Sequence, residues 1–293
     1  MVMKIGVVTD SNSGILPEEA EKLGVWLLPM PFYIDGNCYY ENIDLTRQDF
    51  FVKLAAGAEI ATSSPSPLAV AELWSQALAE CDHILHIPMS SGLSSSCEQA
   101  KALAQEEAFA GRVWVADIGR VATPMHRSIL DALELLGQGF SAAEVQQRLE
   151  KQRADMTIYV MVDELKHLAK GGRISHTTAA LGSILNVKPV LQFDVGMLNI
   201  QAKCRGKKRA RHLMIEAMQA DLQGKFKQQW EAGEVYLVAA GSADAAETAD
   251  WLAQIGESFP GVSVMYDDLP LSLCAHIGEN GLGIGCSCRV KPE

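Results

Sequence analysis

Short apolar runs of strand length recur through the first half of the chain, and segments with helical spacing follow them. The runs lie at residues 4–8, 25–28, 83–87 and 113–116. The helical pattern is clearest after Ser66 and Pro67, which suit the N-cap and the first position of a helix. The apolar face of that helix comprises Val70, Leu73, Trp74, Ala77 and Leu78. This alternation is typical of a mainly parallel sheet covered by helices, so we predict an α/β domain over residues 1–155.

The second half also shows strand and helix patterns, and we predict a second α/β domain over residues 156–293. The expected strands lie at residues 157–162 and 235–240, with a hairpin around Gly196. The expected helices lie at residues 163–169, 209–230 and 243–255. Between them, residues 170–193 predict a glycine-marked loop, a helix rich in small residues and a strand. Gly224 is the weak point of the long helix, and the glycine-rich end of the chain is assigned no strand.

Composition places the chain among globular proteins and disfavours some functions. Its 293 residues are 48% hydrophobic and 21% charged, with a net charge of −11. That charge disfavours binding to nucleic acid and to anionic membranes. No apolar run reaches the roughly 18 residues of a membrane span, and the run after Lys4 predicts a strand rather than a signal peptide. We therefore expect a soluble, cytoplasmic protein.

The cysteine and glycine motifs predict neither a metal site nor a nucleotide cofactor. The seven cysteines are odd in number, and no C-x-x-C occurs. Cys274, His276, Cys286 and Cys288 lie close in sequence, but they lack the two spaced ligand pairs of a usual zinc site. We predict free thiols, as in the cytosol. There is no phosphate-loop lysine motif, and "GLGIG" at 281–285 lies too near the C-terminus for a dinucleotide fingerprint.

Three loops rich in serine and threonine, each between an apolar strand and a helix, give the strongest chemical signal. They are Thr9–Ser13, Thr62–Ser66 and Ser90–Ser96. Loops at the carboxyl ends of parallel strands share one edge of the sheet, where helix N-termini also present free N–H groups. We expect the hydroxyls to converge on a compact anion, a carboxylate or a phosphate. Such residues are also ordinary caps, and Ser95 with Glu98 predicts a capping box.

Six stretches follow one another in a definite order along nearly the whole chain. They are "VVTDSNSGI" (7–15), "ATSSPSP" (61–67), "SSGLSS" (90–95), "KGGRIS" (170–175), "NVKPVL" (186–191) and "AHIGENGLGIG" (275–285). In that order and spacing they resemble the DegV family of bacterial fatty-acid-binding proteins. The resemblance implies two α/β domains with a ligand tunnel between them and a long-chain fatty acid as the ligand. It also implies that Thr62 and Ser94 hold the carboxylate and that His276 supports that end.

The resemblance further implies a partner protein. In many bacteria such a protein presents its fatty acid to a separate, ATP-using fatty acid kinase, and the acyl phosphate enters phospholipid metabolism. The chain itself would then be a binding subunit and not an enzyme. Arg173 and Arg205, each beside a glycine in an expected loop, are our candidates for docking, because arginine binds carboxylate or phosphate at two points. The alternative is that both are ordinary surface arginines, and the preferred acyl length stays open.

Two stretches depart from the pattern of the family. Where the family usually has S-G-T-Y after S-S-x-L, this chain has Ser94, Ser95, Ser96 and Cys97. Where the family usually reads G-P-G after the histidine, this chain has Gly278, Glu279 and Asn280. A carboxylate at Glu279, near an anion site, is unexpected. These changes leave the implied ligand residues in place but bear on the shape of the tunnel and on the fit to a kinase.

Two other classes of function stay open. A serine hydrolase would use Ser94 as the nucleophile and His276 as the base, with Asp10 as the orienting carboxylate, although no G-x-S-x-G elbow is present. The run "KCRGKKRAR" at 203–211 carries six positive charges in nine residues; a solvated helix start is the default interpretation, a surface for a protein partner comes next, and nucleic acid comes last. It has no aromatic side chains to stack on bases.

Overall fold

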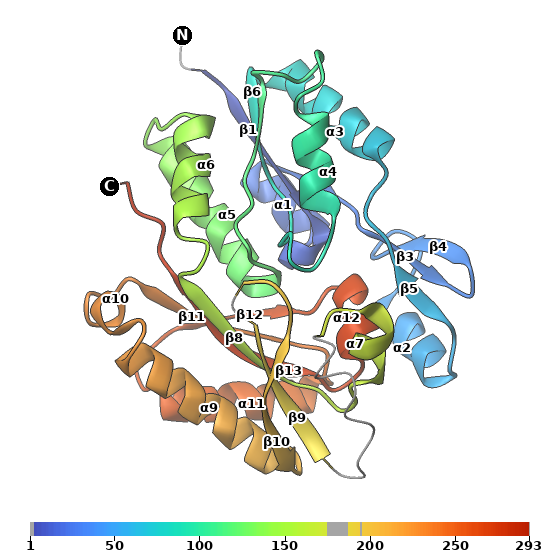
Figure 1. The fold of residues 1–293 in the computed structure, drawn as a ribbon, viewed down its shortest axis with the longest axis vertical. Coiled ribbons are helices and arrows are strands. Elements are labelled where there is room, and N and C mark those ends of the chain that lie inside the picture. Colours follow the sequence, from blue (N-terminus) through green and yellow to red (C-terminus); the bar gives the residue numbers. More distant parts are fainter. Residues whose placement is uncertain (1–2, 175–186, 194, 293) are drawn as a thin grey trace.

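The computed structural model describes residues 3–174, 187–193 and 195–292, and its first sheet is the predicted parallel one. The strand order is β2-β1-β6-β7, with β1 (Ile5–Asp10), β2 (Val25–Leu28), β6 (His83–Ile87) and β7 (Val113–Val115). The helices around it are α1 (Pro17–Leu23), α3 (Pro67–Glu80), α4 (Ser96–Leu103), α5 (Ala122–Gly137) and α6 (Ala142–Lys151) (Figure 1). Because β1 has β2 on one side and β6 on the other, the loops after β1 and β6 meet at the carboxyl edge.

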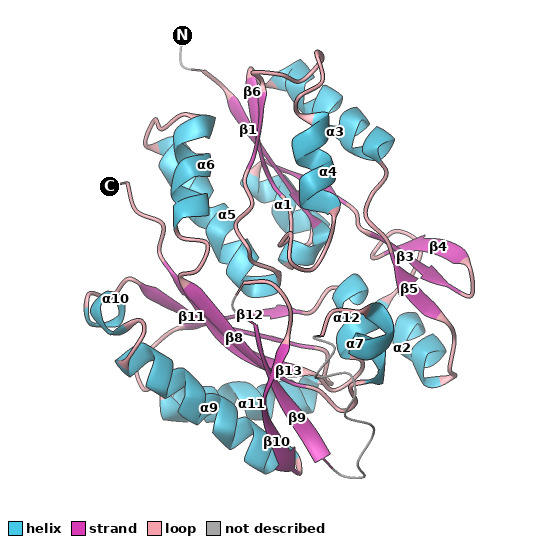
Figure 2. Cartoon of the chain, in the orientation of Figure 1, coloured by secondary structure: helices cyan, strands magenta, loops and turns pink. Residues whose placement is uncertain are grey.

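The second sheet has six strands in the order β10-β9-β8-β13-β11-β12 and is mostly antiparallel. Its strands are β8 (Met156–Met161), β9 (Val187–Phe193), β10 (Asn199–Arg205), β11 (Val235–Gly241), β12 (Val264–Asp268) and β13 (Leu282–Cys288). The helices α9 (Lys207–Gln223) and α11 (Ala245–Ser258) lie on one side of this sheet, and α5 lies on the other (Figure 2). The sheet therefore faces α5 and the parallel sheet with one surface and α9 and α11 with the other.

The third sheet is small and antiparallel, with the strand order β4-β3-β5. It lies apart from the parallel sheet and packs beside the second half of the chain. It contains β3 (Pro31–Ile34), β4 (Asn37–Tyr40) and β5 (Ile60–Thr62), and α2 (Arg47–Ala55) accompanies it next to α7 (Lys166–Gly171) and α12 (Leu271–Ile277) (Figure 1). Arg47 donates to the carbonyl oxygens of Leu269 and Gly241, at 2.7 and 3.1 Å. Residues 31–62 thus reach across to the second half, although the division of the chain near residue 155 stays a prediction.

The end of the chain differs most from the sequence prediction, since β12, α12 and, in its glycine-rich part, the central strand β13 were not predicted. Glycine weakens an isolated strand, so periodicity alone gave β13 no signal. Here the neighbouring strands approach too closely for larger residues: a Cβ at Gly285 would lie 2.9 Å from the carbonyl oxygen of Thr157. Gly285 is therefore a requirement of the sheet.

Three smaller predictions have different outcomes. The helix expected at 209–230 is divided at Gly224 into α9 and α10 (Lys227–Glu231). The capping box at Ser95 is wrong: Ser95 occupies the N-cap of α4, but its hydroxyl makes no capping bond, and it is Ser94 Oγ that accepts from the backbone N–H of Ser96 at 3.2 Å. The helix rich in small residues expected after Gly172 falls mainly on residues 175–186, outside the described residues.

A buried arginine joins the two halves just before the start of α5. Arg120, which is 1% exposed, donates from Nη1 to the hydroxyls of Ser128 and Ser287, at 2.6 and 2.8 Å, and from Nη2 to the carbonyl of Gln152 at 3.0 Å. Ser287 belongs to β13, so the loop before α5 is fixed to the six-stranded sheet. Among the described residues, no helix is both long and apolar enough to cross a membrane.

Candidate functional site

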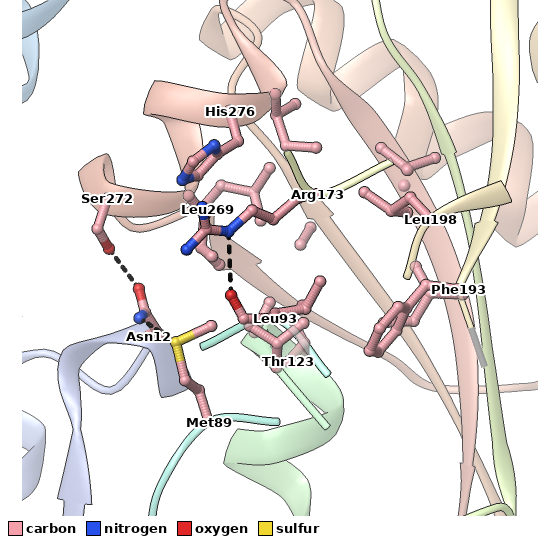
Figure 3. Close-up of a pocket in the computed structure, with 18 of the residues that line it drawn as sticks. Asn12, Met89, Leu93, Thr123, Arg173, Phe193, Leu198, Leu269, Ser272 and His276 are labelled. Atoms are coloured by element: carbon pink, nitrogen blue, oxygen red, sulfur yellow. Dashed lines mark hydrogen bonds between the residues drawn. The ribbon is translucent and has the colours of Figure 1, made fainter. Parts of the chain in front are cut away.

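A cavity lies between the two large sheets, at the carboxyl edge of the parallel sheet. It holds about 1010 Å³ of empty space, counting the part that is open to solvent. Its roof includes Val121, Ala122, Thr123 and Pro124 at the start of α5, and Thr123 donates to the carbonyl oxygen of Ala239 at 2.9 Å. Its floor is the six-stranded sheet. Figure 3 shows the polar side chains His276, Arg173 and Ser272 on one side and the apolar Phe193 and Leu198 on the other.

The floor is formed by residues at alternate positions of four strands. They are Ile158 and Val160 in β8, Phe193 in β9, Val238 and Ala240 in β11, and Gly283 in β13; Ala239 of β11 also lines the cavity, and its carbonyl oxygen accepts from Thr123. Side chains alternate between the faces of a strand, and the intervening residues Tyr159, Met161 and Leu237 pack toward α9 and α11. The cavity is therefore lined by apolar side chains over most of its surface, which suits an alkyl chain.

The polar end brings together two of the predicted ligand residues. Thr62 Oγ1 and His276 Nε2 are 2.9 Å apart, and both side chains line the cavity. Thr62 ends β5, whereas His276 lies near the end of α12, so the contact joins segments that are 214 residues apart. The prediction that the loop at Thr62 follows a parallel strand is wrong, because β5 belongs to the antiparallel sheet.

Ser94 also lines the cavity. Contacts between serine hydroxyls connect its loop to the loop that follows Thr62. Ser64 Oγ is 3.4 Å from Ser94 Oγ and 2.9 Å from Ser95 Oγ. The loop after β1 joins them through Asp10, whose carboxylate accepts from the backbone N–H of Met89 at 2.7 Å. The three loops lie next to one another, but Asn12 is the residue that the first loop contributes to the cavity lining, so the convergence of all the hydroxyls on an anion stays a prediction. Asp10 itself is buried, and the burial raises its pKa to about 6.

Arg173 lines the cavity, although we predicted it as a docking residue. Its Nε donates to the carbonyl oxygen of Leu93 at 3.0 Å, and its Nη1 donates to that of Gly171 (Figure 3). No acidic side chain in the described parts of the chain forms an ion pair with it. A guanidinium without a carboxylate partner beside an apolar cavity favours an anionic ligand. Arg205, at the exposed end of β10, does not line the cavity.

His276 is held in its neutral form. Burial lowers its pKa to about 4, and the positive charges of Arg173 and His167 add to this effect. Its Nδ1 is buried and has no hydrogen-bond partner among the described residues. The backbone of α7 lies directly against the ring, because a Cβ on Gly171 would come within 2.2 Å of Nδ1. Thr62 is thus the one polar partner of His276 in the described structure.

The two departures from the family pattern are accommodated outside the cavity lining. Cys97 is fully buried in the apolar cluster of α3 and α4. Asn280 takes a left-handed conformation, with φ of 61°, and donates to Asp163 at 3.3 Å. Glu279 is exposed and does not line the cavity, so its carboxylate does not oppose an anion there.

The described residues form neither the hydrolase triad nor the zinc site that the sequence analysis considered. No hydrogen bond joins Ser94 to His276, and Asp10 accepts from the backbone of Asn12 and Met89 instead of orienting the histidine. The four residues weighed as zinc ligands form no cluster in the described parts of the chain. In the basic run, Arg211 is buried and pairs with Glu247 and Asp250 of α11, at 2.8 and 2.6 Å, which leaves fewer charges for a partner.

Sequence reasoning missed a buried polar group beside the polar end of the cavity. Ser272 of α12 donates to Asn12 Oδ1, and Asn12 Nδ2 donates to Met89 Sδ at 2.8 Å (Figure 3). Asn12 and Ser272 line the cavity. Asn12 lies in the first of the three predicted loops, so the loop pattern could have identified it. Ser272 had no sequence signal, because the helix that carries it was not predicted.

The fold and the cavity define the class: an α/β protein whose two large sheets enclose an apolar cavity with one polar end. The family model described as an uncharacterised protein of the DegV family matches residues 4–288. The chain belongs to the DegV family. It is 35% identical to a DegV domain-containing protein of Deinococcus radiodurans over 209 residues, which are 71% of this chain and 74% of that protein. A DegV domain-containing protein of Listeria monocytogenes is 28% identical over 98% of this chain and 99% of its own length.

Solved structures of the family share the fold. A fatty-acid-binding DegV family protein from Thermus thermophilus is 31% identical and has a TM-score of 0.85, over 98% of this chain and all of that one. DegV from Bacillus subtilis, described as a fatty acid binding protein, is 26% identical with a TM-score of 0.82, over 98% of this chain and 99% of that one.

The pKa of His276 predicts how stability depends on pH. Between about pH 6.5 and 4 the unfolded chain binds a proton at His276 that the folded protein excludes, so this residue lowers stability as pH falls. In the ligand-free protein, wild type should lose about 3 kcal/mol more than His276→Gln across that window. Urea unfolding of both proteins at several pH values measures this difference. His212→Gln, at an exposed histidine, should follow wild type, and parallel curves for wild type and His276→Gln would contradict the account.

Proposed function

We propose that the cavity binds a long-chain fatty acid, with its carboxylate at Thr62 and Ser94 and its acyl chain along the six-stranded sheet. The observation that carries this proposal is the combination of an apolar lining with a polar end that contains Arg173, which has no acidic partner among the described residues. A fatty acid has the same distribution of polarity. Family members from Thermus thermophilus and Bacillus subtilis are described as binding fatty acids, which supports the proposal.

His276 prepares Thr62 to donate a hydrogen bond. A neutral histidine that carries its proton on Nε2 donates to Thr62 Oγ1, and the hydroxyl proton of Thr62 is then free for a carboxylate oxygen. The opposite tautomer would place an N–H at Nδ1, against Gly171, where no described acceptor lies. In this proposal His276 acts as a positioning residue behind the threonine.

Ser94 and Arg173 complete the carboxylate site. The hydroxyl of Ser94 lies at the N-terminus of α4 and has one proton to donate while it accepts from Ser96. Arg173 supplies the positive charge that offsets the removal of a carboxylate from water. Burial of about 15 methylenes at ~0.8 kcal/mol each gives roughly 12 kcal/mol before the costs of association, which is sufficient for micromolar binding.

The position of the polar end suits presentation of the fatty acid to a kinase. Ser63 lines the cavity and is exposed, and Ser95 is exposed beside Ser94, so the carboxylate would lie close to the surface. An ATP-using kinase needs that access, and it brings further negative charge. Arg205 and Arg173 are our proposed docking residues, and Arg173 would also contact the ligand. The chain would then serve as a binding subunit for acyl-phosphate formation.

The carboxylate site can be tested with two single substitutions. Thr62→Ala and Ser94→Ala should each weaken palmitate binding by about tenfold to a hundredfold, because a hydrogen bond to a charged group contributes ~1.5–3 kcal/mol. Calorimetry on delipidated protein measures the effect. Ser91→Ala is the matched control from the same loop, since its hydroxyl donates to Asp117 and accepts from Arg153. Equal losses for Ser91 and Ser94 would show that the wrong hydroxyl has been assigned, and a wild type that binds no fatty acid would refute the function.

The docking role predicts a separation of binding from phosphorylation. Arg205→Ala should leave palmitate affinity unchanged and lower the rate of acyl-phosphate formation by a cognate kinase about tenfold, with Arg205→Lys restoring it only in part. Arg173→Ala should reduce both. Arg112→Ala, at an exposed arginine beside α3, is the control. Unchanged kinetics for Arg205→Ala across a titration of the binding protein would remove this residue from the interface.

A further inference from the structure

The central strand of the floor presents no large side chain to the cavity. On the cavity face of β13 the residues are Gly283, Gly285 and Ser287, and each is paired with one residue of β8 and one of β11. This gives three successive layers across the sheet. They are Val160–Gly283–Ala240, Ile158–Gly285–Val238 and Met156–Ser287–Tyr236. Because β13 follows α12, which carries His276, the layers lead away from the polar end in that order.

The first layer is open. Gly283 lines the cavity, and a Cβ built on it would meet two backbone oxygens, of Tyr159 at 3.3 Å and of Ala240 at 3.5 Å, with Val160 Cβ at 3.8 Å. The side chains of this layer do not reach over the glycine. An alkyl chain can therefore lie directly on the backbone of β13 at this point.

The second layer, which we call the closing layer, is covered. A Cβ on Gly285 would lie 3.2 Å from Ile158 Cγ1 and 3.2 Å from Val238 Cγ2, so these side chains lean over the glycine from both sides. Ile158 and Val238 line the cavity, whereas Gly285 does not. The same strand is thus exposed to the cavity at one glycine and covered two residues further on, about 7 Å along the strand.

The third layer is polar. Ser287 accepts a hydrogen bond from Arg120 at 2.8 Å, and the ring of Tyr236 packs against the guanidinium of Arg127 at 4.2 Å. Arg120 is 1% exposed and holds the two halves of the chain together at this point. An alkyl chain gains nothing from contact with a buried guanidinium. If a smaller side chain opened space in the closing layer, that space would consequently end at the third layer.

We propose that the closing layer limits the length of the acyl chain, with Val238 as the residue that sets the limit. This inference rests on the proposed function, and it assigns the methyl end of the ligand to the contact between Ile158 and Val238. Val238→Ala removes the cover of Gly285 from one side and admits a longer chain. Ala240→Val does the reverse, because it adds two methyl groups to the open layer beside Gly283.

The test measures the affinity of delipidated protein for lauric, myristic, palmitic, stearic and arachidic acids. Val238→Ala should shift the ratio of affinities toward the longer acids by about tenfold per step of two methylenes. Ala240→Val should shift it toward the shorter acids by a similar factor. Val235→Ala is the matched control, since it truncates the same residue type in the same strand but faces α9 and α11. Thermal unfolding identifies any variant that does not fold.

The possible outcomes separate this inference from the function on which it rests. A wild type that binds none of the five acids refutes the proposed function. A wild type that binds them, with a length profile that neither Val238→Ala nor Ala240→Val changes, overturns the closing layer and leaves fatty-acid binding intact. Opposite shifts in the two variants, with the profile of Val235→Ala unchanged, support the closing layer.

Discussion

The contact between Thr62 and His276 is the interaction on which the polar end of the cavity depends. A carboxylate can enter an apolar cavity only where hydrogen-bond donors replace its water. Thr62 comes from the small sheet and His276 from α12, so neither the first nor the second half of the chain forms the site alone. Thr62 reaches His276 because residues 31–62 extend from the parallel sheet toward the second half of the chain. Arg47, which donates to the carbonyl oxygens of Leu269 and Gly241, holds this segment against the six-stranded sheet.

The opposite end of the cavity is fixed by a different polar group. Arg120 connects the loop before α5 to Ser128, Gln152 and Ser287, and it lies beyond the apolar floor. The space between the two sheets is therefore bounded by hydrogen-bonded polar groups at both ends and is apolar between them. Among the described lining residues, the charged group and most of the hydroxyl donors lie at the end with Thr62, Ser94 and Arg173, and the hydroxyl of Thr123 already donates to Ala239. In the proposed function, that asymmetry would give a bound fatty acid a single orientation.

The sequence predicted most of the parallel sheet and the loops that line the site, because the first half consists of local patterns. Pro67 after Ser66 marked a helix start, and residues 83–87 form the expected strand. Prediction from the sequence failed where contacts between distant segments determine the structure. The glycines of β13 carry no strand signal, yet Gly285 is required by the closeness of Thr157. Nothing local shows that Ser94 replaces Ser95 as the capping hydroxyl, or that Arg173 turns toward the cavity.

The assignment of Thr62, Ser94 and His276 came from the resemblance to the family, and it remains a proposal supported by the geometry of the cavity. A crystal structure with α-bromopalmitate tests it most directly, because the bromine marks the carbon beside the carboxylate. We expect its anomalous peak within contact distance of Thr62, Ser94 and Arg173. A peak beside Phe193 or Val238 would reverse the ligand, and a peak outside the cavity would contradict the account as a whole.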